Sequence, residues 1–130
     1  MTDERIDAVR AVNDAFYAAH EGRDLDAMRA LWTHTDRVVC VHPGWPILRG
    51  WADVETSWRQ IFDGPGENQF LITNTSITVA TDTAWITLEE NLIDAGEVMA
   101  IAATNIFSLD GKAWKMVAHH AAPIMPTLGR

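Results

Sequence analysis

The sequence predicts an α+β domain in which three N-terminal helices pack on a curved, mostly antiparallel sheet and enclose a pocket. Before about residue 66 the apolar residues recur with the 3.6-residue period of helices, and after it with the two-residue period of strands. The short sequences "TD", "DAG" and "DG" separate the later runs, as in β-hairpins. The chain has 130 residues, so we expect residues 1–130 to form a single domain.

The first half of the chain predicts three helices and a strand. Apolar side chains at helical spacing predict the first helix over residues 3–21, and a glycine follows it. Asp24 is placed to cap a short second helix. The apolar run at 37–43 is typical of a strand that ends at a proline, and a loop rich in proline and glycine follows. A third helix is expected over residues 51–62, where the apolar residues form one stripe.

Four β-rich runs come next, and each should form one strand of the sheet. They cover residues 68–80, 83–93, 97–109 and 112–121. Runs of about ten residues extend roughly 33 Å, and antiparallel strands of that length twist and curl. Three helices packed inside such a curl leave its open end unfilled. We therefore expect a cone with a pocket lined by side chains from the inner face of the sheet.

The composition excludes several classes of partner. The formal net charge is −8 and the isoelectric point is about 4.9, whereas nucleic acids and anionic membranes require a basic surface. The first residues are acidic and amphipathic, unlike a signal sequence, and no apolar run reaches the roughly 20 residues of a membrane-spanning helix. We therefore expect a cytoplasmic protein that binds neither nucleic acid nor membrane.

Motifs for cofactors and for covalent catalysis are missing from the sequence. It contains no glycine-rich phosphate loop, no nucleophile elbow and no CxxC pair. The single cysteine, Cys40, lies in an apolar run and is expected to be a buried thiol. The histidines do not show the spacing of common metal sites. We therefore expect no cofactor and no metal.

Several segments resemble the NTF2-like superfamily, the cone-shaped α+β fold that includes ketosteroid isomerase, scytalone dehydratase and the SnoaL polyketide cyclases. The segments that carry the resemblance are "FYAAHEGRDLDAMRALW", "VHP", "WADVETSWRQIF", "EEN", "ATNIF" and "WKMVAHHA". They extend over nearly the whole chain, and the SnoaL-like group is the most similar. The resemblance implies a cone fold, a pocket for a small molecule, and an outer sheet face that forms a dimer.

The resemblance also implies where the polar groups of the pocket lie. Ketosteroid isomerases carry a tyrosine on the first helix, and the matching position is Phe16, with Tyr17 beside it. Their general base precedes a proline at the end of the first strand, where this chain has His42. Their protonated aspartate lies on the third long strand, where this chain has Asn105. Because the chemical group differs at each position, we expect another proton transfer or hydration reaction rather than steroid isomerisation.

Only one of His119 and His120 can face the pocket, because adjacent strand residues point to opposite sides of the sheet. Alternation from Asn105 across the hairpin turn puts Met116 and His120 inside, and it puts His119 on the outer face. A one-residue bulge would exchange the two histidines. We expect His120 to face inward and to form an acid–base pair with His42, since histidine titrates near neutral pH.

Only one of the adjacent residues Glu89 and Glu90 can face the pocket as well. The family pattern favours Glu90 as the inner residue, whereas alternation from Trp85 favours Glu89, and the sequence leaves both assignments open. An inward carboxylate needs a partner, and a histidine beside it would give a His–Glu pair. The candidate catalytic residues are His42, Glu90, Asn105 and His120.

The six tryptophans are many for a chain of this length, and they can line a pocket for an apolar ligand. Trp58 lies on the predicted third helix and faces the sheet, while Trp45 lies in the proline-flanked loop over the mouth. The candidate ligand-binding residues are Tyr17, Trp45, Trp58, Trp85 and Met116.

Two kinds of function remain open from the sequence. One is a cofactor-independent isomerase, dehydratase or cyclase for a small apolar carbonyl compound, in which a histidine moves the proton and Asn105 bonds the carbonyl oxygen. The other is a non-catalytic small-molecule binding protein or a structural dimer. A homodimer through the outer sheet face is expected, because residues 99–107 are apolar on both faces of their strand.

Overall fold

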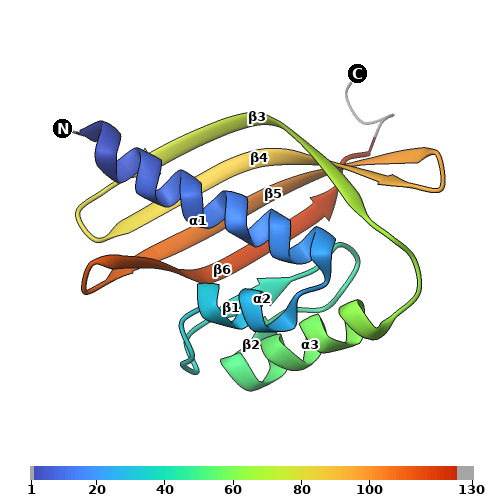
Figure 1. Cartoon of the computed structure of the whole chain (residues 1–130), viewed down its shortest axis with the longest axis horizontal. Helices are drawn as coiled ribbons and strands as arrows, with labels where there is room; N and C mark the ends of the chain where they lie inside the picture. Colours follow the sequence, from blue (N-terminus) through green and yellow to red (C-terminus); the bar gives the residue numbers. More distant parts are fainter. Residues whose placement is uncertain (1, 126–130) are drawn as a thin grey trace.

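The computed structural model describes residues 2–125, with side chains from residue 4 onward. Within this range the chain forms three helices on one face of a six-stranded sheet (Figure 1). The helices are α1 (Thr2–Gly22), α2 (Leu25–Leu31) and α3 (Trp51–Asp63). The strands are β1 (Val39–Val41), β2 (Leu48–Arg49), β3 (Gln69–Val79), β4 (Thr83–Asp94), β5 (Glu97–Asp110) and β6 (Ala113–Pro123). The predicted α+β class is confirmed.

The sheet is mixed and open, with the strand order β2-β1-β6-β5-β4-β3. Strands β3 to β6 form an antiparallel meander that matches the four predicted runs, while β1 lies parallel to β6. The short β2 was expected to be loop, because two residues show no alternation. Helix α1 crosses the meander along its length, and α2 and α3 lie at the end of the sheet near β1 and β2 (Figure 1).

Each helix buries an apolar stripe against the sheet. Phe16 of α1 and Val54 and Trp58 of α3 have no exposed surface, and each such large side chain contributes roughly 1.5–3 kcal/mol by its burial. Asp24 caps α2 as predicted, since its carboxylate accepts a hydrogen bond from the backbone N–H of Ala27 at 3.0 Å.

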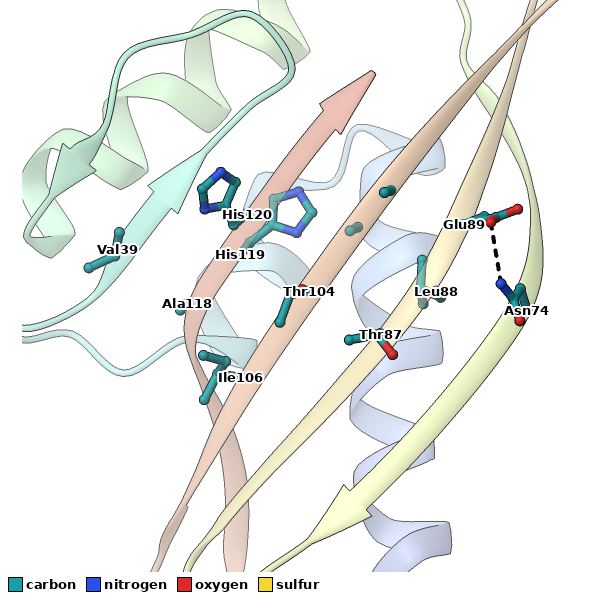
Figure 2. Close-up of a pocket in the computed structure, with 12 residues that line it drawn as sticks. Val39, Asn74, Thr87, Leu88, Glu89, Thr104, Ile106, Ala118, His119 and His120 are labelled. Atoms are coloured by element: carbon teal, nitrogen blue, oxygen red, sulfur yellow. Dashed lines mark hydrogen bonds between the residues drawn. The ribbon is translucent and has the colours of Figure 1, made fainter. Parts of the chain in front are cut away.

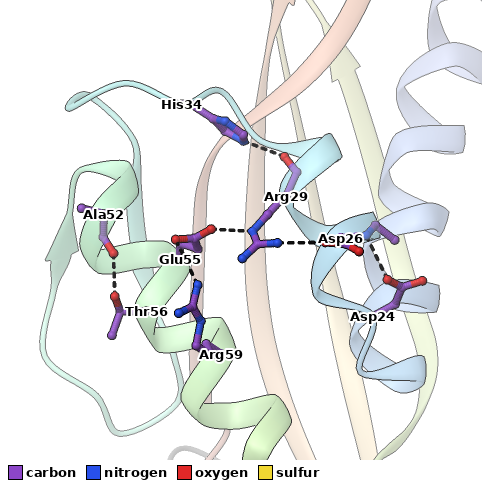
Figure 3. A network of polar contacts seen from close by, with 9 residues as sticks. Asp24, Asp26, Arg29, His34, Ala52, Glu55, Thr56 and Arg59 are labelled. Carbon is purple, nitrogen blue, oxygen red and sulfur yellow. Dashed lines mark hydrogen bonds and ion pairs between the residues drawn. The ribbon is translucent and has the colours of Figure 1, made fainter.

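The outer surface of α2 and α3 carries a network of ion pairs (Figure 3). Arg29 of α2 pairs with Glu55 of α3 and, at 2.8 Å, with Asp26 of its own helix. Arg59 lies 3.5 Å from Glu55. Solvent screens such partly exposed pairs, so the network links α2 to α3 without adding much to stability.

The end of α1 holds the connection between α3 and β3. Arg23, whose φ is 53°, donates hydrogen bonds from its guanidinium to the backbone carbonyls of Gly64 and Pro65. The carboxylate of Glu21 accepts a hydrogen bond from the backbone N–H of Phe70 at 2.7 Å. These contacts fix the start of β3, where Phe70 forms part of the cavity wall described below.

A β-bulge in β6 decides which histidine faces the helices. Val117 has no partner of its own on β5, because pairing passes directly from Met116 to Ala118. The extra residue shifts the alternation by one position. His119 is therefore inward and 2% exposed, whereas His120 is exposed on the outer face. The expectation that His120 faces inward is wrong, and the bulge is the reason.

Candidate functional site

The helices and the inner face of the sheet enclose a cavity of about 270 Å³. Its polar lining residues are His20, His42, Asn68, Glu90 and His119. Its apolar lining residues are Pro43, Trp45, Ile61, Phe70, Leu92, Met99 and Ile101. Among the described residues, neither lysine nor arginine contributes to this wall. The cavity therefore combines titratable groups with an apolar enclosure.

A larger hollow of about 790 Å³ lies on the outer face of the sheet (Figure 2). Its floor carries small and polar side chains such as Thr87, Ala102 and Thr104. At its edge Asn74 donates a hydrogen bond to Glu89 at 3.3 Å. The buried titratable side chains converge on the smaller cavity instead, so the smaller cavity is the candidate site.

Glu90 supplies the carboxyl group of the cavity. Strand β4 alternates regularly through Ile86 and Leu88, which places Glu90 on the helix-facing side with 3% exposure. Burial raises the pKa of Glu90 from 4.5 to about 7, and a hydrogen bond from Tyr17 opposes this shift. At neutral pH both the protonated and the ionised forms are populated, which suits a general acid or base.

Tyr17 holds Glu90 from behind the cavity wall. Its hydroxyl oxygen lies 2.5 Å from Oε2 of Glu90. Burial, together with the charge of Glu90, raises the pKa of Tyr17 far above its usual value, so the hydroxyl keeps its proton. An ionised Glu90 can only accept a hydrogen bond, and Tyr17 is the donor.

Asn105 joins Tyr17 to His119. Its side-chain nitrogen donates to Oδ1 of Asn13 at 2.8 Å and to the hydroxyl oxygen of Tyr17 at 3.3 Å. Its oxygen lies 2.6 Å from Nδ1 of His119. Asn105 is fully buried, and both of its donor hydrogens are used inside the protein. The expectation that Asn105 bonds a ligand carbonyl is therefore corrected: its contacts orient His119.

His119 is the inward histidine of β6, and it is neutral at physiological pH. Burial, and secondarily the nearby His42 and His20, hold its pKa well below the usual range. Its Nδ1 is bonded to Asn105. Its other ring nitrogen, Nε2, has no hydrogen-bond partner among the described residues. His119 therefore offers one nitrogen for contact with a ligand in the cavity that it lines.

His42 follows β1 and is held by α3. Its Nε2 lies 2.9 Å from Oγ of Ser57, whose single hydroxyl proton is donated to the carbonyl of Val54 at 2.7 Å. Nε2 of His42 is consequently the donor in its own bond. Burial lowers the pKa of His42 to about 4. The ring meets Trp58 edge-on at 4.6 Å and Trp45 at 5.0 Å between centroids.

His20 was not predicted as a site residue. Burial lowers its pKa to about 4, and its Nδ1 has no hydrogen-bond partner among the described residues. The ring packs against Phe70 and Trp58, with centroid distances of 4.6 and 5.1 Å. Helical spacing could have found it, because His20 lies three and four residues after Tyr17 and Phe16 and thus on the same face of α1.

The predicted site residues fall into three groups. Those that line the cavity are His42, Trp45 and Glu90. Those that lie behind its wall are Tyr17, Trp58 and Asn105. The ambiguity between the two glutamates is resolved in favour of Glu90, as the family pattern indicated.

The third group of predicted residues lies away from the cavity. His120 is on the outer face because of the bulge. Trp85 is 39% exposed there too, since alternation along β4 places it on the same side as Glu89. Met116 is fully buried beside Trp32, in the core rather than in the cavity wall. These residues do not lie where a ligand in the cavity could reach them.

Neither a metal-binding cluster nor a membrane-spanning helix is found within residues 2–125. No three side chains of the histidine, cysteine, aspartate or glutamate types lie close enough together there to hold a metal ion. None of the helices in this range is both long and apolar enough to cross a membrane.

The sequence matches a known family over most of its length. Residues 9–126 match the family described as "SnoaL-like domain". The F-box protein SKIP8 of Arabidopsis thaliana is 30% identical over 119 residues, which cover 91% of this chain and 50% of that protein. The chain thus spans about half the length of this curated relative.

Solved structures share the fold. A Streptomyces avermitilis protein, provisionally described as a dehydratase of the NTF2-like family, is 34% identical with a TM-score of 0.89, over 96% of this chain and 99% of that one. A Thiobacillus denitrificans protein, provisionally described as a calcium/calmodulin-dependent protein kinase type II association domain, is 36% identical with a TM-score of 0.83, over 89% and 94% of the two chains. The predicted NTF2-like architecture is confirmed.

Proposed function

The chain belongs to the SnoaL-like domain family, and we propose that its cavity moves a proton on a small, largely apolar carbonyl compound without a cofactor. The reaction is of the isomerase, dehydratase or cyclase type. Glu90 carries this proposal, because it is a buried carboxyl group that lines the cavity and has a pKa of about 7. Proton transfer is most efficient when the pKa of the catalytic group lies near the working pH.

In this reaction the ionised Glu90 takes a proton from the carbon beside the carbonyl group, and the carbonyl oxygen gains the negative charge as an enolate. Protonated Glu90 then returns the proton to another atom of the same molecule, which completes an isomerisation. In a dehydration it gives the proton to the departing hydroxyl group, which leaves as water. Tyr17 keeps Oε2 of Glu90 in a fixed place throughout.

The surroundings of Glu90 support this role. The apolar part of the wall, which includes Trp45 and Phe70, lowers the polarity around the buried Glu90, and a less polar surrounding strengthens electrostatic interactions. The Streptomyces avermitilis relative, 34% identical, is provisionally described as a dehydratase, and dehydration is one of the reactions that such a carboxyl group can perform.

Solvent deuterium exchange tests the proposal without knowledge of the natural substrate. Cyclohexanone and cyclohex-2-enone in D₂O are followed by NMR for deuterium uptake at the carbon beside the carbonyl group. The wild-type protein is expected to accelerate uptake for at least one ketone, and Glu90→Gln is expected to lower the rate by about 100-fold or more.

Glu89→Gln is the matched control, because Glu89 is the neighbouring carboxylate on the opposite face of β4, and it should leave the exchange rate unchanged. Full activity of Glu90→Gln, or no acceleration with either ketone, would refute the assignment of Glu90. Saturable ketone binding without exchange would instead assign the cavity to ligand binding alone.

We also propose that two copies of the chain pair through the outer sheet face. Ala102 and Trp85 are exposed on that face, and Ile106 is half-buried there. Small and apolar side chains such as Ala102 and Ile106 allow two sheets to approach closely there. The relative from Thiobacillus denitrificans is provisionally described as an association domain, which supports self-assembly of this chain.

Analytical ultracentrifugation tests the dimer directly. Wild-type protein is expected to sediment as twice the chain mass of 14.5 kDa, and Ala102→Glu is expected to shift it to the monomer, since a charge buried without a partner opposes association. Thr81→Glu, which adds the same single negative charge at the exposed turn between β3 and β4, is a control for the change in charge. A wild-type protein that remains at 14.5 kDa at all concentrations would rule out the pairing.

A further inference from the structure

We propose that the carbonyl compound taken by the cavity is neutral and also bears a hydroxyl group, whose O–H donates to Nε2 of His119, and that Asn13 is the positioning residue that sets this preference for a hydroxyl group. The proposal rests on the cavity assigned above and names the ligand class that it takes. It follows from the direction of the hydrogen bonds behind the cavity wall.

The donor and the acceptor in each of these hydrogen bonds can be assigned one after another, beginning with the bond between Tyr17 and Glu90. The hydroxyl proton of Tyr17 goes to Oε2 of Glu90, so the Tyr17 oxygen can only accept from Asn105. The group of Asn105 that faces Tyr17 is therefore the NH₂ group, and its second hydrogen goes to Oδ1 of Asn13 at 2.8 Å. Asn105 then has only its oxygen to offer His119.

This orientation fixes the tautomer of His119. Nδ1 lies 2.6 Å from the oxygen of Asn105 and must carry the proton that joins them. A neutral imidazole has one N–H group, so Nε2 keeps a lone pair and can only accept. Among the side chains that line the cavity, His119 is thus an obligatory acceptor, and it pairs with a ligand hydroxyl rather than with a carbonyl oxygen.

Asn13 is the part of this arrangement that a substitution can remove without touching the cavity. It lies on α1 with 4% exposure, outside the cavity wall, and it contacts Asn105 rather than His119. Its oxygen holds one of the two Asn105 hydrogens. Without it, the amide of Asn105 is held only by the longer bond of 3.3 Å to Tyr17 and is free to turn over.

The rest of the wall disfavours anions. Among the described residues no lysine or arginine lines the cavity, and Glu90 and the lone pair of His119 both repel a carboxylate or a phosphate. His42 adds no fixed cation at neutral pH, because burial lowers its pKa to about 4. A volume of about 270 Å³ is at the lower limit of pockets for drug-sized ligands, so the ligand is a single ring or a short chain.

Two NMR measurements on the full chain test the proposal. In protein labelled with ¹⁵N-histidine, Nε2 of His119 is expected to show the shift of an unprotonated ring nitrogen at neutral pH. Cyclohexanol, cyclohexanone and cyclohexanecarboxylate are then titrated as matched probes. Cyclohexanol is expected to bind most tightly, about tenfold or more ahead of the carboxylate, and to move the Nε2 signal.

Asn13→Ala is expected to give a mixture of His119 tautomers and to reduce the preference for cyclohexanol over cyclohexanone. Asn13→Asp keeps an oxygen acceptor and should restore both the single tautomer and the preference for cyclohexanol. Asp14→Ala, at the exposed neighbouring position on α1, is the control.

A protonated Nε2 in the wild type, or a carboxylate that binds as tightly as the alcohol, would overturn the proposal. These readouts do not depend on exchange at Glu90, so the two proposals fail separately, and the wild-type results decide the matter even if Asn13→Ala does not fold.

Discussion

Replacement of Glu90 by glutamine is expected to stabilise the folded protein at neutral pH. The pKa of Glu90 rises from 4.5 to about 7 on folding, because the carboxyl group is buried. Between these values the folded state keeps a proton that the unfolded chain has released, so a rise in pH favours unfolding. Glutamine has no proton to lose, and the advantage of the variant should grow across this window to about 3 kcal/mol of unfolding free energy.

Urea denaturation of both proteins between about pH 5 and pH 8 measures the effect. The difference between variant and wild type isolates Glu90, since every other titrating group is common to both. The introduced glutamine can still accept the proton of Tyr17 through its carbonyl oxygen, so the local structure should persist. Glu89→Gln on the outer face controls for the loss of one carboxylate. A difference that does not change with pH would contradict the burial of a titrating carboxyl group.

Acid is expected to unfold the protein steeply, because its buried histidines resist protonation. Burial lowers the pKa of His20 and His42 from 6.5 to about 4, and that of His119 falls as well. Between 6.5 and 4 the unfolded chain binds protons that the folded state excludes, so stability falls as the pH falls. His20 and His42 each account for about 3 kcal/mol of this loss. Glu90 has the opposite effect, because its protonation favours the folded state as the pH falls, but it is one group and the buried histidines are three.

The variant that checks this expectation is His20→Leu, which removes a buried imidazole whose Nδ1 has no partner among the described residues. The slope of unfolding free energy against pH should become shallower below pH 6.5 in this variant. His120→Leu, which removes an exposed imidazole from the outer face, is the matched control. An unchanged slope in His20→Leu, or an equal change in both variants, would contradict the assignment.

Both expectations describe groups that cost the protein stability. A buried Glu90 and three neutral histidines around one cavity are less favourable there than apolar side chains would be. Natural proteins keep such arrangements mainly at sites of function. The pH dependence of stability and the proposed chemistry therefore have the same physical origin.

The order of the elements could be predicted from the sequence because each element carries its own period. The helical stripe of α3 and the alternation of β4 are local patterns, and no contact far along the chain was needed to recognise them. The α+β class and the long strands followed from these patterns. Strand β2 did not, since a two-residue strand exists only through its pairing with β1.

The orientation of single side chains was predictable only where the strand is regular. Along β5, the family resemblance put Asn105 on the inner face, and the regular alternation of the strand places it there. Along β6, the unpaired Val117 reversed it, and His119 took the place expected for His120. The bulge arises from the pairing between β5 and β6, and no pattern in the sequence "KMVAHH" predicts it.

Alternation also could not predict how far an inward-facing side chain lies behind the surface of the cavity. Tyr17 and Asn105 do face inward, yet both are buried outside the cavity wall, and they act on the cavity through Glu90 and His119. The family resemblance located these positions but not their separation from the ligand. His20 was not predicted, because the family resemblance pointed only to Phe16 and Tyr17 on the first helix.

The role of Glu90 as proton carrier is tested most directly by its own titration. In protein labelled with ¹³C-glutamate, the carboxyl signal of Glu90, assigned by its loss in Glu90→Gln, is followed by NMR against pH. The structure predicts a midpoint of about 7. A midpoint at the ordinary value of 4.5 would show that the carboxyl group is solvated and would remove the basis for proton transfer in this cavity.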